Sequence, residues 1–206
     1  MVTTQSRRLG ILIALALVMA ATRIHLSLLH HSVQDASWAV FFLAGFWLRG
    51  TGRGAARYGM FALLMAEAVL IDYLVISNQG IDFWSHYCVS AAYWFLIPSY
   101  FSLWLGGSWL ARHVDGLNLR TLGLAIAALL VSVTACYVIS NGSFYWLSSS
   151  VPLPRSFAAW WQNLADWYLP FAQTTALYVG IGALLHVLAV QLARALRHGD
   201  QPNRPG

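Results

Sequence analysis

The sequence predicts an all-α integral membrane protein with six transmembrane helices and both termini in the cytoplasm. Of the 206 residues, 59% are hydrophobic and only 9% are charged, whereas a soluble domain carries roughly 25% charged residues. The apolar residues gather in long runs, and a chain of this length has room for about six helices of ~20 residues each. Most of the basic residues fall on one side of these runs, which sets the expected orientation.

Six apolar runs are the expected helices. In chain order they are 9–29, 37–48, 55–76, 91–111, 119–139 and 167–192. The second is short for a membrane span. The longest polar break, 140–156, contains SNGS and SSSVPLP, which are typical of turns because glycine permits positive φ and proline lacks a backbone donor. We predict one six-helix membrane domain over residues 1–198 and a polar, disordered tail over 199–206.

The twelve basic residues are all arginines, and they indicate topology. Placing the N-terminus in the cytoplasm puts ten of the twelve on the cytoplasmic side, as the positive-inside rule expects. The exceptions are Arg23, near the outer end of the first span, and Arg155, in an outer loop. We expect no nucleic-acid partner, because such a partner would need a soluble basic face.

This orientation places most of the chemically versatile side chains on the outer side. The stretch DFWSHYCVSAAYW, residues 82–94, lies in the second outer loop. Charged groups within a bilayer are costly and usually face a cavity or a partner, so Arg23 and Asp72 could contact each other or line a cavity. The candidate ligand-binding residues are His31, Asp72, Trp84, His86, Tyr87, Cys88, Tyr93 and Arg155.

The residues alone leave three interpretations of Cys88. It can be a small apolar filler, a disulfide partner of Cys136, or a ligand or nucleophile whose thiolate a nearby cation favours. The chain has two cysteines and no CxxC pair, so no zinc site is indicated. His86 alone is more often a solvated loop residue than a ligand. The aromatic residues of 82–94 can form an interfacial belt or the wall of a site for a large flat ligand.

The six-span size, the segment ALVMA at residues 16–20 and the binding groups in outer loops together resemble the S-components of energy-coupling-factor vitamin transporters. Within that group, ATRIHLSLLHHSVQDASWAVFFLAGFWL, residues 21–48, and a cysteine after the third span are similar to the BtuM family of small bacterial cobalamin transporters. The resemblance implies a multi-pass protein of the bacterial inner membrane that takes up vitamin B12 or a precursor. It also implies that Cys88 is an axial ligand of the corrin cobalt.

The resemblance carries two further expectations. Small residues four apart let another helix approach closely, and the resemblance implies that Ala16 and Ala20 dock an energy-coupling-factor module. A thiolate from Cys88 would also weaken the bond to the opposite axial ligand, so Cys88 would be catalytic if cyanide is removed from cyanocobalamin. Two alternatives remain open: an exosortase-like transpeptidase using Cys88, Arg155 and His86, and a thiol redox protein using Cys88 and Cys136.

Overall fold

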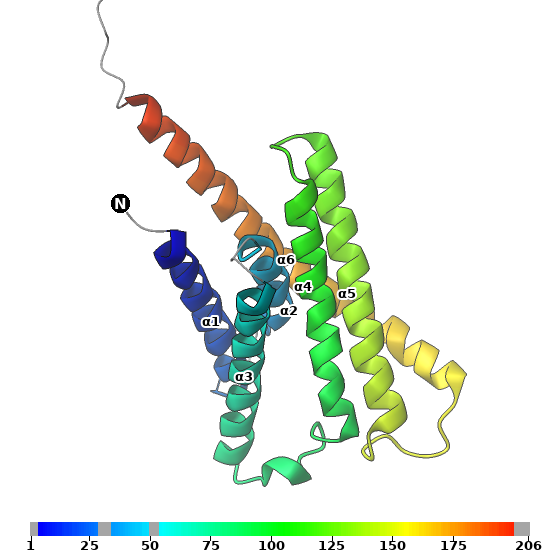
Figure 1. Ribbon diagram of the computed structural model, residues 1–206. Coiled ribbons are helices and arrows are strands. Elements are labelled where there is room, and N and C mark those ends of the chain that lie inside the picture. Colours follow the sequence, from blue (N-terminus) through cyan, green and yellow to red (C-terminus); the bar gives the residue numbers. More distant parts are fainter. Residues whose placement is uncertain (1–3, 29–33, 50–53, 200–206) are drawn as a thin grey trace, which may run out of the picture.

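The structure is a computed structural model that describes residues 4–28, 34–49 and 54–199. Over these residues it is helical, without strands. The α-helices are α1 (Thr4–Leu28), α2 (Ser37–Trp47), α3 (Gly54–Asn78), α4 (Leu96–His113), α5 (Leu119–Leu147) and α6 (Phe157–Gly199). Two short 3₁₀ helices, η1 (Phe83–Ser85) and η2 (Ala91–Phe95), lie between α3 and α4 (Figure 1).

Three stretches of the described chain are long and apolar enough to cross a membrane, namely Tyr58–Asn78, Leu119–Leu147 and Phe157–Leu196. Only 33%, 28% and 6% of their most apolar windows are buried inside the protein. Apolar surface on this scale needs a hydrocarbon solvent, and a helix satisfies its backbone hydrogen bonds within such a solvent. The protein is therefore an α-helical membrane protein.

The short helix α2 lies at the centre of the bundle and packs against α1, α4 and α6. All its residues from Ser37 to Gly45 are buried, which explains why α2 is apolar on every side. Two glycines bring the α2 and α4 backbones together. A Cβ at Gly45 would lie under 3.0 Å from the Trp104 carbonyl oxygen, and one at Gly107 equally close to that of Phe42. At 11 residues, α2 is about 16 Å long and cannot cross the ~30 Å hydrocarbon core by itself.

The α3–α4, α4–α5 and α5–α6 connections lie at two opposite ends of the molecule (Figure 1). The start of α1, the α4–α5 connection and the end of α6 lie toward one end, and the α3–α4 and α5–α6 connections lie toward the other (Figure 1). α6 crosses α4 and α5 obliquely. Its 43 residues span about 64 Å, more than the ~40–45 Å of a bilayer with its headgroups.

The polar break predicted over 140–156 is wrong in its first half, because α5 continues to Leu147. The Ser140 hydroxyl donates to a carbonyl of the preceding helical turn at 3.3 Å. The Asn141 side-chain nitrogen donates to the Asn163 side-chain oxygen of α6 at 2.7 Å. These polar side chains therefore find partners inside and between helices, and local turn preference is overridden.

The last helix also differs from its prediction. α6 begins at Phe157 and continues through Pro170, whereas hydropathy alone predicted a span over 167–192. The tryptophan-rich first turns of α6 are too polar for a hydropathy window but are helical all the same. Of the tail predicted over 199–206, Gly199 is the last residue of α6, and residues 200–206 lie outside the described residues.

Candidate functional site

A cavity of about 550 Å³ is lined in part by the α3–α4 connection, which lies at one end of the molecule (Figure 1). We call it the polar cavity, and its walls come from α1, α3, α4, α5, η2 and the loop between η1 and η2. Five of the predicted ligand-binding residues line it: Asp72, His86, Tyr87, Cys88 and Tyr93. Ligand pockets usually measure about 300–1,000 Å³, so this cavity is the candidate binding site.

Hydrogen bonds between side chains and the backbone of residues two or three positions away shape the loop that carries His86 and Cys88. The Asp82 carboxylate accepts from the backbone N–H of Ser85 at 3.1 Å and caps η1. The Ser90 hydroxyl accepts from a backbone N–H of η2 and caps that helix. Between the caps, the backbone at His86 is extended, and its Nδ1 accepts from the backbone N–H of Cys88 at 3.3 Å. Both side chains line the polar cavity.

Cys88 is a half-buried free thiol. Burial raises the pKa of this thiol, a hydrogen bond with Tyr87 opposes the rise, and the negative charge of Asp72 adds to it. The group is therefore protonated at neutral pH, and a metal that binds the sulfur has to displace the proton. Cys88 is suited to tight coordination and poorly suited to act as an unassisted nucleophile.

The raised pKa of Cys88 predicts slow alkylation of the free protein at pH 8, compared with an unperturbed cysteine. Only the thiolate reacts, so the rate should rise about tenfold per pH unit through pH 8 and level off only above the ordinary cysteine pKa. The measurement is iodoacetamide labelling of Cys136→Ser protein against pH. Asp72→Asn removes a charge that raises the pKa and should move the profile to lower pH. A pH profile of the parent centred below the ordinary cysteine pKa of about 8.5 would contradict a raised pKa for Cys88.

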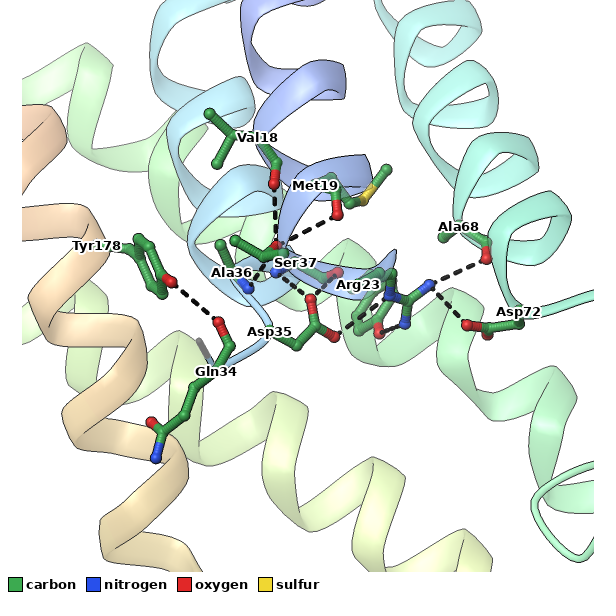
Figure 2. Close-up of polar contacts among 12 residues, drawn as sticks. Val18, Met19, Arg23, Gln34, Asp35, Ala36, Ser37, Ala68, Asp72 and Tyr178 are labelled. Atoms are coloured by element: carbon green, nitrogen blue, oxygen red, sulfur yellow. Dashed lines mark hydrogen bonds and ion pairs between the residues drawn. The ribbon is translucent and has the colours of Figure 1, made fainter. Parts of the chain in front are cut away.

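Arg23 of α1 ties three other segments together at the wall of the polar cavity (Figure 2). Its Nε donates to Asp35 Oδ2 at 3.3 Å, just before α2 begins. Its Nη1 donates to the Ala68 carbonyl at 3.0 Å and lies 3.3 Å from Asp72 Oδ1, both on α3. Its Nη2 donates to the Tyr100 hydroxyl of α4 at 3.0 Å. Arg23 and Asp72 thus contact each other and also line the cavity.

Asp72 links this arginine to the loop side of the cavity. The Tyr93 hydroxyl donates to Asp72 Oδ2 at 2.8 Å. One guanidinium therefore faces two carboxylates, Asp72 and Asp35, which leaves an excess of negative charge. Tyr100 was not among the predicted ligand-binding residues. A signal for it exists, since Tyr100 follows Tyr93 by seven residues, two helical turns along one face.

Two of the predicted ligand-binding residues that the structure describes, Trp84 and Arg155, are not brought to the polar cavity. Trp84 is 72% exposed and lines a separate pocket of apolar side chains beside α3 and η2. Arg155 lies in the α5–α6 connection, where its guanidinium donates to the backbone carbonyls of Trp146 and Ser148. It therefore stabilises its own loop. His31 lies outside the described residues.

The structure also bears on the alternatives for the cysteines. Cys88 and Cys136 are both free, so the disulfide considered from the sequence is not formed. Cys136 is fully buried within α5, as a small apolar filler would be. The combination of Cys88, His86 and Arg155 expected of an exosortase-like enzyme is not assembled, because Arg155 is absent from the cavity lining.

The polar cavity brings together a thiol, an imidazole, phenols and carboxylates on walls of apolar side chains. This combination can coordinate a metal through sulfur and bind polar groups around it. No family model matches the chain, and no curated protein matches its sequence.

Proposed function

We propose that this protein is a cobalamin-binding transporter of the bacterial inner membrane, which takes up vitamin B12 or a precursor through the polar cavity. Cys88 is the axial ligand of cobalt. The observation that carries the proposal is the Cys88 thiol in the lining of a cavity of about 550 Å³. Thiolate is a good ligand for such a transition metal.

The donor set of the cavity favours a metal that arrives with its own ligands. In the described part of the chain, no group of three or more His, Cys, Asp or Glu side chains is placed so that it could hold a metal ion. A hydrated metal ion would therefore lack the ligand set that protein sites usually provide. A corrin ring supplies the equatorial ligands itself, so one protein thiolate in the axial position is sufficient.

The other lining residues suit the periphery of a corrinoid. The corrin ring carries amide side chains, which donate and accept hydrogen bonds. Asp72 accepts such bonds, while the Tyr93 hydroxyl and the His86 ring nitrogens provide further polar atoms. Tyr87 is 63% exposed at the cavity, where its ring can cover a flat ligand. A whole cobalamin is larger than the cavity, so part of the ligand would project from the opening.

The experiment that tests the function is an absorption spectrum of protein purified from cells grown with cobalamin. Bound corrin gives visible bands that no side chain of the protein produces. We expect these bands to remain with the protein through gel filtration. A colourless protein at saturating cobalamin would contradict the proposal. It would favour the alternatives, a membrane enzyme or a thiol redox protein.

The proposed topology has six spans, both termini in the cytoplasm and the polar cavity outside. We expect an impermeant maleimide to label Leu153→Cys and not Leu119→Cys in intact cells. Both positions are well exposed, at 80% and 86%. Leu153 lies in the α5–α6 connection and Leu119 begins α5 after the α4–α5 connection, and these two connections are at opposite ends of the molecule (Figure 1). Both variants are made in a protein with Cys88 and Cys136 replaced by serine, so that the maleimide cannot label a native cysteine. The reverse labelling pattern would invert the topology.

The proposed docking surface for an energy-coupling-factor module is formed by Ala16 and Ala20. Both are half-buried on α1, and Ala16 also packs against the core. Replacing both with leucine is expected to leave corrin binding intact and to reduce uptake, because larger side chains keep a partner helix at a distance. The matched control replaces Ala14 and Ala21, which are exposed on the same helix. Equal uptake by the two double variants and the parent would remove the docking role.

A further inference from the structure

A second cavity, of about 510 Å³, lies between α2, α4, α5 and α6. It lies toward the α4–α5 connection, at the end of the molecule opposite the polar cavity (Figure 1). Its lining is aliphatic, aromatic or glycine except for Thr121, His186 and Arg194. We call it the apolar groove.

The apolar groove needs an occupant because of where it lies. α6 packs against α2 and α5, and its C-terminal end diverges from α4 and α5 (Figure 1). Water finds few hydrogen-bond partners on such a lining, and apolar cavities of this kind stay dry and take up apolar molecules. A void would forfeit the dispersion contacts of every lining side chain. An apolar, flexible molecule from the bilayer fills the groove best.

The groove is long enough to hold one lipid within a single leaflet of a bilayer. Its lining on α6 runs from Ala176 to Arg194, which is about 27 Å along the helix axis. Half of the hydrocarbon core measures about 15 Å. One acyl chain therefore fits between the deep end of the groove and the membrane interface, with room left for a headgroup near Arg194.

The charge at the mouth of the groove selects the headgroup. Arg194 is exposed and forms no ion pair with another described residue. Two other arginines at this end are engaged: Arg120 lies 3.3 Å from the Asp115 carboxylate, and Arg49 donates to the Ala111 carbonyl at 2.5 Å. Basic residues near a membrane surface attract anionic lipids. Arg194 is therefore the cation in the lining of the groove that can bind a lipid phosphate.

We propose that the apolar groove is a binding site for one phospholipid with an anionic headgroup. The acyl chain lies along the rings of Phe46 and Trp47, which already contact His186 of α6. The lipid phosphate lies at Arg194. This lipid bridges α6 to α4 across the space where the two helices diverge, and it is retained when the bulk bilayer is replaced by detergent.

The groove can be filled from within by one substitution. A Cβ at Gly180 would meet nothing within 4 Å, and Gly180 lines the groove. Gly180→Leu therefore places a side chain in the acyl-chain volume at a position where its Cβ meets no neighbouring atom. The matched control is Gly123→Leu, since Gly123 is also exposed on a helix with nothing within 4 Å but lies outside the lining.

The test is native mass spectrometry of the full chain in mild detergent, without corrinoid, after exchange into phosphatidylglycerol or phosphatidylcholine. We expect one retained phosphatidylglycerol in the parent and in Gly123→Leu, and its loss in Gly180→Leu. Arg194→Gln should weaken retention about fivefold. Arg120→Gln should not change it, because Arg120 is already paired with Asp115.

Three outcomes would overturn the proposal. Equal retention of both lipids would remove the role of charge. Unchanged retention in Gly180→Leu would place the lipid elsewhere. A protein helix cross-linked at position 180 in membranes, with no lipid retained by the parent, would make the groove a site for a protein partner. None of these readouts depends on whether the polar cavity binds a corrinoid.

Discussion

Replacing Cys88 with serine is expected to abolish the shift in the corrin absorption spectrum that accompanies binding to the parent protein. Serine is nearly isosteric with cysteine but is a harder and far less acidic donor, so the cavity keeps its shape while the metal–sulfur bond is lost. The measurement is a titration of purified protein with cobalamin, with spectra compared at saturation. The effect should be complete, because no other cysteine lines the cavity.

Cys136→Ser is the matched control for this prediction. Cys136 is fully buried in α5 and lies outside the lining of the polar cavity, so its replacement should preserve the shift. A serine hydroxyl inside a helix can donate to a carbonyl one turn earlier, which limits the cost of burying it. If parent and Cys88→Ser gave identical spectra at saturation, the coordination would be disproved even if the vitamin still bound.

Replacing Gly45 or Gly107 with alanine is expected to lower the free energy of unfolding by about 3 kcal/mol, the upper part of the range for overpacked cores. In each case the added Cβ meets a backbone carbonyl of the opposite helix at under 3.0 Å. Backbone cannot rotate away as a side chain can, so α2 and α4 must separate. Their separation would also strain the hydrogen bond of 3.0 Å from the Ser108 hydroxyl to the Gly45 carbonyl.

Gly123→Ala measures what the same chemical change does where space is free. A Cβ at Gly123 meets nothing within 4 Å, and alanine is favoured over glycine in helices by up to ~1 kcal/mol. This variant should be neutral or slightly more stable. Unfolding of all three variants in mixed micelles by a denaturing detergent, followed by circular dichroism, supplies the comparison. Equal stabilities for Gly45→Ala, Gly107→Ala and Gly123→Ala would refute close α2–α4 packing.

Composition was sufficient to establish the class of the protein. Charged residues at 9% and apolar residues at 59% cannot provide the surface of a soluble domain, and the structure confirms an α-helical membrane protein. Hydropathy located the helices well where apolar runs are long, as in 119–139. It placed the ends poorly at Ser140 and Phe157, because it measures the transfer of a segment into hydrocarbon and not the contacts of its polar side chains with neighbouring helices.

Which of the versatile side chains share a site became clear from the packing of the helices. The sequence proposed that Arg23 and Asp72 could meet, and the packing of α1 against α3 brings them to 3.3 Å. The sequence also proposed Arg155 as a ligand-binding residue, but its guanidinium donates to the backbone carbonyls of Trp146 and Ser148. Residue type and spacing along the chain are local properties. Which helix faces meet depends on close packing between distant segments, as at Gly45 in α2, and no local pattern specifies that.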